Sequence, residues 1–105
     1  MSDANPQIAV MAKVTAAPGQ RDQLASALQI ALDAASTESG TIYYLLHADS
    51  ADADTLWMYE LYADQAALDA HQGSDAYKSL GAAIGPFLGG RPVLTFMKPL
   101  GGKGF

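Results

Sequence analysis

The chain has 105 residues, of which half are hydrophobic and 16% are charged, and its formal net charge is −5. This length suits one domain with a modest core, and the high apolar content indicates an extra buried surface such as a subunit interface. Only six Lys and Arg residues are present and they are scattered, which argues against nucleic acid as a partner, while the absence of cysteine excludes disulfides and thiolate chemistry.

The N-terminal segment and the lack of long apolar runs bear on the cellular location of the protein and on the bounds of its domain. Residues 1–7 have neither the basic start nor the apolar stretch of a signal peptide, and no apolar run reaches the length of a membrane span. We therefore expect a cytoplasmic protein with no membrane partner. It would have a disordered lead-in over residues 1–7, one domain over residues 8–100 and a flexible, glycine-rich tail over residues 101–105.

Hydrophobic periodicity and turn residues predict four strands and three helical segments. Pro18 and Gly19 form a turn after the first strand, and Asp64 and Ser74 are typical helix caps. The predicted elements are a strand at 8–16, a helix at 21–36, two strands within 41–62, a helix from Asp64 through His71, a helix from Ser74 to Gly85, and a strand at 92–98.

The two strands within residues 41–62 are apolar and aromatic on both faces. A loop over residues 50–54 places position 49 opposite position 55, and opposite residues of an antiparallel pair point the same way. One face then holds Tyr43, Leu45, His47, Trp57, Tyr59 and Leu61. The other face holds Ile42, Tyr44, Leu46, Leu56, Met58, Glu60 and Tyr62. A sheet that is apolar on both faces must be covered on both.

The order β-α-β-β-α-β predicts an α+β, ferredoxin-like split βαβ fold. Right-handed crossovers place both helical segments on one face of the sheet. The second face is then uncovered, and we expect a homodimer in which two sheets face each other, giving a dimeric α/β barrel.

Glu60 and His71 are the titratable residues that the pattern singles out. A carboxylate among apolar strand residues is costly unless it is paired, so Glu60 is either a functional group or a structural one held by a backbone amide, Lys13 or Arg91. His71 ends a helix, and it is either a surface cap or a proton acceptor at the mouth of a pocket. His47 and Glu60 fall on opposite faces, so no metal site is predicted.

Three stretches resemble the antibiotic biosynthesis monooxygenase domain, in its quinol-monooxygenase-like branch. They read E-S-G-T-I-Y-Y-L-L-H at 38–47, L-W-M-Y-E-L-Y-A-D-Q-A-A-L-D-A-H at 56–71 and F-M-K-P at 96–99. The resemblance covers roughly residues 8–100 and implies the same dimeric ferredoxin-like fold. It does not extend to the haem-degrading members, whose iron-ligating histidine falls at Gly81.

The resemblance implies an enzyme that oxidises a quinol or phenolic polycycle with dioxygen, without metal, flavin or other cofactor. A pocket lined by Tyr44, Met58, Tyr62, Tyr77 and Ile84 would suit a flat aromatic substrate. We expect catalytic roles for His71, Tyr62 and Glu60, because one strand and the helix that follows it can bring them to one end of the sheet. Two alternatives stay open: a non-catalytic protein that binds a small molecule on the same scaffold, and an isomerase or dehydratase-like enzyme.

Overall fold

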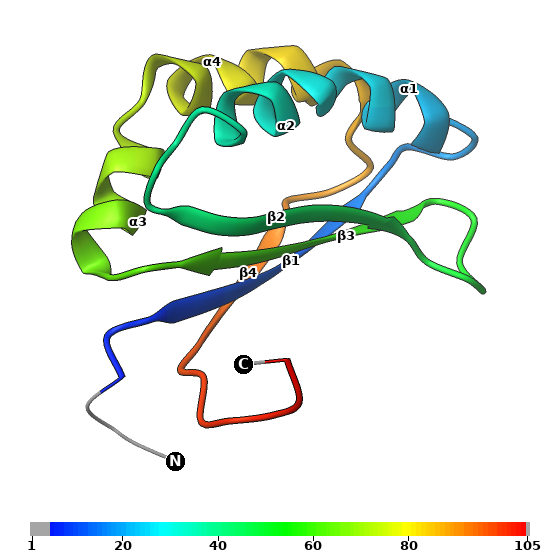
Figure 1. Cartoon of the computed structure of the whole chain (residues 1–105). Coiled ribbons are helices and arrows are strands. Elements are labelled where there is room, and N and C mark those ends of the chain that lie inside the picture. Colours follow the sequence, from blue (N-terminus) through cyan, green and yellow to red (C-terminus); the bar gives the residue numbers. More distant parts are fainter. Residues whose placement is uncertain (1–4, 105) are drawn as a thin grey trace.

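The computed structural model describes residues 5–104, in which a layer of helices covers one face of a four-stranded antiparallel sheet (Figure 1). Residues 1–4 and Phe105, which belong to the predicted lead-in and tail, lie outside the described residues. The strand order β2-β3-β1-β4 confirms the predicted ferredoxin-like α+β fold. The elements are β1 (Ile8–Thr15), α1 (Arg21–Ala27), α2 (Gln29–Ala35), β2 (Thr41–Ala48), β3 (Thr55–Tyr62), α3 (Gln65–Gln72), α4 (Asp75–Ile84), the short 3₁₀ helix η1 (Gly85–Phe87) and β4 (Val93–Met97).

Side-chain caps mark the starts of α3 and α4. The Asp64 carboxylate accepts a hydrogen bond from the Ala67 amide at 2.8 Å, and the Ser74 hydroxyl accepts one from the Tyr77 amide at 3.2 Å, so both predicted N-caps are confirmed. The single helix predicted over 21–36 is wrong in one respect, because α1 and α2 are separated at Leu28. The break is slight, since Leu28 keeps helical angles and its amide still bonds the Leu24 carbonyl.

The hairpin register confirms the predicted pairing, because Ala48 faces Leu56 and the Asp49 amide donates to the Thr55 carbonyl. The predicted face of Ile42 is wrong. The ladder shifts between Thr41 and Tyr43, which leaves Ile42 in a β-bulge without a partner and exposed.

The helix-facing side of the sheet is the core. It is built from alternate residues of the three adjacent strands β1, β3 and β2, and the helices contribute their apolar stripes. The buried residues of the main cluster are Ala12, Val14, Ala16, Leu24, Leu28, Leu56, Met58 and Ile84.

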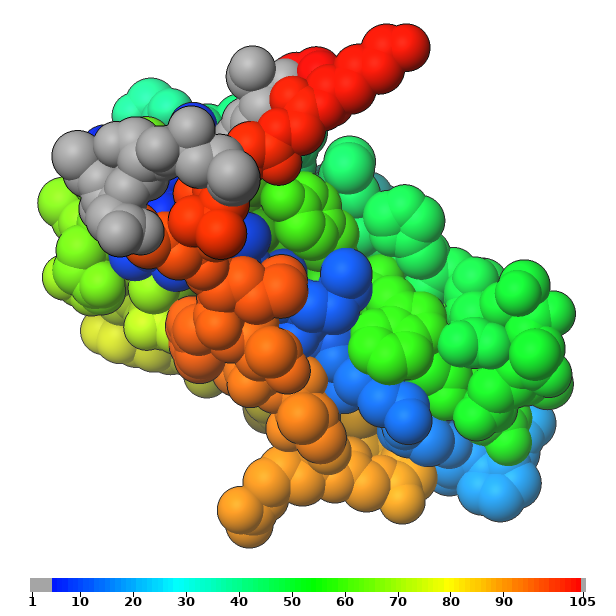
Figure 2. All heavy atoms as spheres, turned by 90° about the horizontal axis from the view of Figure 1, so that it is seen from below, coloured from blue at the N-terminus to red at the C-terminus, as the bar shows by residue number. Residues whose placement is uncertain are grey.

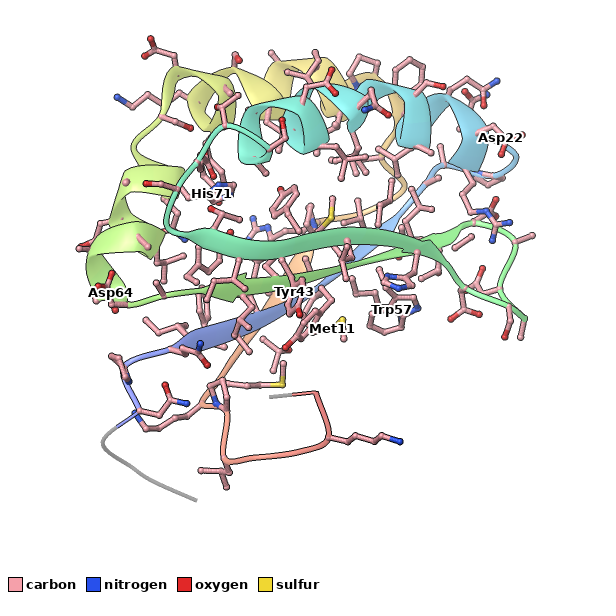
Figure 3. All side chains as sticks on the ribbon, viewed as in Figure 1. Met11, Asp22, Tyr43, Trp57, Asp64 and His71 are labelled. Carbon is pink, nitrogen blue, oxygen red and sulfur yellow. The ribbon has the colours of Figure 1, made fainter. Side chains whose placement is uncertain are left out.

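Figure 2 shows the opposite face of the sheet from below. This face carries exposed apolar side chains, among them Tyr43 and Leu45. Met11, Tyr43 and Trp57 project from this face, away from the helices (Figure 3). Leu45 is 46% exposed, and Met11, Leu45, His47, Trp57 and Tyr59 line a shallow hollow there. The edge strand β4 is exposed on both sides, since Phe96 remains 53% exposed although it pairs with the buried Val10.

A close backbone approach at Gly89 gives a test of the fold. A Cβ at Gly89 would lie 2.4 Å from the Ala16 carbonyl oxygen, whereas a Cβ at Gly90 would meet nothing within 4 Å. The Gly89 amide also donates to the Thr15 carbonyl at 2.8 Å. We expect Gly89→Ala to lower the free energy of unfolding by roughly 1–3 kcal/mol, the usual cost of overpacking. Urea unfolding of Gly89→Ala and of the control Gly90→Ala checks this. Equal stabilities of the two variants would contradict it.

Candidate active site

A cavity of about 440 Å³ lies between the helices and the sheet. Its wall is mainly apolar and combines residues of all four strands, of α3 and α4, of the junction between α1 and α2, and of the segment before β4. The lining residues are Ala12, Val14, Leu28, Tyr44, Met58, Glu60, Gln72, Tyr77, Lys78, Leu80, Gly81, Ile84, Pro92 and Leu94. Its size and character match those of sites for small organic molecules.

Four of the five residues predicted to line the pocket lie in this wall, and Tyr62 does not. Tyr44 and Met58 reach it from neighbouring strands, and Tyr77 and Ile84 reach it from α4. The alternation of side chains along the strands had placed Tyr44 and Met58 on the same face of the sheet. Helical spacing had placed Tyr77 and Ile84 on the apolar stripe of α4. The structure brings the four together, and their contact with a substrate stays a prediction.

Glu60 is the carboxyl group of the cavity. It lies in β3, is 6% exposed, and accepts a hydrogen bond of 2.5 Å from the Tyr62 hydroxyl. Burial raises the pKa of the Glu60 carboxyl, and the Tyr62 hydrogen bond and the nearby His71 counteract part of this rise. Lys13, one of the partners considered from sequence, lies instead over the Trp57 ring on the other face of the sheet.

Tyr62 is fully buried beneath α3 and lies outside the cavity lining. Burial, followed by the charge of Glu60, raises the pKa of the Tyr62 phenol well above its usual range. Its hydroxyl therefore stays protonated and donates to Glu60, which holds the carboxyl group in position.

His71 lies between the helices and the sheet, in the last turn of α3 (Figure 3). It is only 5% exposed, so the prediction of a histidine at a pocket mouth is wrong, as is its alternative of a surface cap. Its Nδ1 lies 2.8 Å from Oε1 of Glu38. The rings of Tyr44, Tyr62 and Tyr77 surround it at centroid distances of 5.2, 5.2 and 5.3 Å.

Sequence reasoning did not select Glu38, although it lies in a stretch that carries the family resemblance. It precedes β2 by three residues, and its Oε1 also accepts a hydrogen bond from the Thr41 hydroxyl at 2.8 Å. The available signal was a carboxylate just before Gly40 and the strand, a place where loop residues commonly carry function.

No group of three His, Cys, Asp or Glu side chains within residues 5–104 is arranged to hold a metal ion. His47 is exposed on the open face of the sheet, where its ring nitrogen Nδ1 lies near the Leu45 carbonyl. Glu60 points to the opposite face. Within residues 5–104, none of the helices has the length and hydrophobicity of a membrane span.

The structure thus combines a ferredoxin-like sheet with a buried carboxyl group in the wall of a mainly apolar cavity. The chain belongs to the antibiotic biosynthesis monooxygenase family, which it matches over residues 7–83. This membership supports a general monooxygenase-like function.

Relatives from bacteria agree with this family. A Mycobacterium tuberculosis protein named "Putative monooxygenase Rv0793" is 32% identical over 93 residues, covering 89% of this chain and 91% of the relative. Its solved structure superposes with a TM-score of 0.82 at 31% identity over 92% of this chain and 98% of that one. A Caulobacter crescentus structure titled as a "putative antibiotic biosynthesis monooxygenase" gives a TM-score of 0.84 at 28% identity, covering 92% of each chain.

Proposed function

We propose that this protein is a monooxygenase that oxidises a quinol or phenolic polycycle with dioxygen and needs no cofactor. The observation that carries the proposal is Glu60, a carboxyl group of raised pKa in the wall of an otherwise apolar cavity. A group that titrates closer to neutral pH than an ordinary carboxylate is a better general base. The family membership and the name of the mycobacterial relative support the same class of reaction.

The reaction begins with removal of the substrate's hydroxyl proton by Glu60. The resulting anion is electron-rich and donates one electron to triplet dioxygen, and the two radicals combine to form a peroxide at a ring carbon that carries hydrogen. Glu60 returns its proton to the peroxide. Loss of the ring hydrogen as a proton and cleavage of the O–O bond then leave a carbonyl group and water. One oxygen atom enters the substrate, the other leaves in water, and the substrate supplies all four electrons.

The residues around Glu60 have separate roles in this scheme. Tyr44 and Met58 contact the flat face of the substrate, and Tyr77 and Ile84 close the opposite wall. Tyr62 holds the Glu60 carboxyl group through its hydroxyl. His71 lies behind the tyrosine wall, so it assists Glu60 through charge and position and makes no direct contact with the substrate.

Oxygen uptake tests the proposal. Menadiol and a phenolic anthrone are incubated with the protein after treatment with a chelator, and dioxygen consumption is compared with autoxidation in buffer. The proposal expects faster uptake than autoxidation and one ¹⁸O atom in the product from ¹⁸O₂. A protein that only binds these compounds would show affinity without uptake, and an isomerase or dehydratase would change a substrate without consuming dioxygen. Either outcome would refute the oxygenase.

We also propose that a second copy of the chain covers the open face of the sheet, giving a homodimer. The support is the exposed apolar surface around Leu45, which resembles the centre of a protein interface. We expect Leu45→Glu to yield monomers in sedimentation velocity at micromolar concentration, because a buried unpaired charge is costly. Ile30→Glu is the matched control, since Ile30 is exposed on the helical side. Unchanged sedimentation of Leu45→Glu would contradict the proposed interface.

A further inference from the structure

The ion pair between Glu38 and His71 joins two parts of the chain that lie 33 residues apart. His71 is almost completely buried, whereas the Glu38 side chain is 20% exposed and so reaches the surface. Because a carboxylate oxygen accepts hydrogen bonds, the contact makes Nδ1 the protonated nitrogen of the ring. The opposite nitrogen, Nε2, then faces the interior.

Nε2 of His71 is buried and has no hydrogen-bond partner within the described part of the chain. The His71 side chain also lines a small space of about 10 Å³, whose other polar lining residues are Glu38, Tyr44, Ser74 and Tyr77. A space of this size holds roughly one water molecule, and buried waters satisfy polar groups that the protein leaves unpaired.

Tyr44 and Tyr77 line both this small space and the large cavity, so they form the wall between the two. Tyr44 is also the direct cross-strand partner of Glu60 on the covered face of the sheet. Their side chains therefore lie side by side, with Cβ atoms about 5 Å apart in such a pair. Tyr44 is thus the residue that links Glu60 to the space beside His71.

We propose that one water molecule occupies this small space and bonds Nε2 of His71, and that Tyr44, the water, His71 and Glu38 form a hydrogen-bonded path along which protons pass between Glu60 and solvent. This path rests on the proposed function, because it serves Glu60 as the base of the oxygenase. Glu60 must be deprotonated at the start of each turnover, and a proton that it carries between turnovers must leave an apolar cavity. The path provides an exit that stays open when substrate fills the cavity. Glu38 is a positioning residue and the outer end of the path.

The first test is structural and needs no activity. ¹⁵N NMR of the imidazole rings is expected to show His71 protonated at Nδ1 and slow to exchange, with the exposed His47 as the internal reference. A crystal structure at high resolution is expected to show a water within hydrogen-bond distance of Nε2. Absence of that water from well-defined density, or protonation at Nε2 alone in neutral His71, would overturn the path.

The second test uses Glu38→Ala, with Asp33→Asn on the exposed side of α2 as the matched control. We expect kcat of Glu38→Ala to fall roughly 10-fold, the scale at which partners of active histidines act, with KM unchanged. Formate is expected to restore much of the lost kcat, since it can replace the missing carboxylate at a partly exposed position, and a purely structural role for Glu38 would not be rescued.

The outcomes separate this inference from the proposed function. Full kcat in Glu38→Ala, or a loss that formate does not restore, would refute the path while leaving the oxygenase intact. If the wild-type protein consumes no dioxygen, the proposed function fails. The NMR and crystallographic results would then still decide whether the water and the His71–Glu38 geometry exist.

Discussion

Replacing Glu60 with glutamine is expected to lower kcat by roughly 10²- to 10⁴-fold, the scale of losing a general base. Glutamine keeps the size of the side chain and can still accept the hydrogen bond that Tyr62 donates. The cavity wall and the substrate contacts should therefore persist. Stopped-flow measurement of quinol oxidation under single-turnover conditions checks the chemical step, and substrate binding to the inactive variant serves as the control.

The pH dependence of activity gives an independent test of Glu60 as the base. Glu60 must be deprotonated to act as a base, and burial raises the pKa of this carboxyl group above its ordinary value of 4.5. Activity should therefore rise with pH over a range higher than that of an exposed glutamate. The residual activity of Glu60→Gln should lack this rise. An identical pH profile in wild type and variant would contradict a role for Glu60 as the base.

Stability distinguishes a functional Glu60 from a structural one. A raised pKa in the folded state means that the native protein binds a proton which the unfolded chain has already released. Stability then falls as pH rises from the ordinary glutamate range to the raised pKa, and it stays at the lower level above that. We expect Glu60→Gln to be at least as stable as wild type at neutral pH. A clear loss of stability with retained activity would instead assign Glu60 a structural role.

The parts of the site that could be predicted from the sequence are those fixed by short-range geometry. Strand parity and a five-residue loop placed Tyr44, Met58 and Glu60 on one face, and the register confirms this. Side-chain caps at Asp64 and Ser74 set the starts of α3 and α4, which in turn orient Tyr77 and Ile84. Each of these inferences spans only a few residues.

The parts that could not be predicted depend on how distant segments pack. The pairing of His71 with Glu38 joins a helix end to a loop 33 residues earlier, and no local pattern indicates that contact. The burial of His71 follows from three tyrosine rings on three different elements. The bulge at Ile42 and the break at Leu28 likewise occur without the glycine or proline that usually signals them.

Replacing His71 with alanine is expected to destabilise the protein by roughly 2–4 kcal/mol, in line with other large-to-small changes in a core. The sequence alone suggested a helix-terminal histidine with little packing, and that expectation is wrong because the ring is enclosed by Tyr44, Tyr62 and Tyr77. The change also removes the partner of Glu38. Urea unfolding measures the loss, and substitution of the exposed His47 with alanine is the matched control.

The same variant reports on catalysis through the pH profile, provided that it is assayed well below its unfolding transition. The charge of protonated His71 lowers the pKa of the Glu60 carboxyl group, so its removal should raise that pKa further. The rise of activity with pH is then expected at higher pH in His71→Ala than in wild type, and kcat at neutral pH should fall roughly 10²-fold once the proton path is also lost. Full activity with an unshifted profile would show that Glu60 works without His71. In that case the enclosed histidine would serve only to support the tyrosine wall.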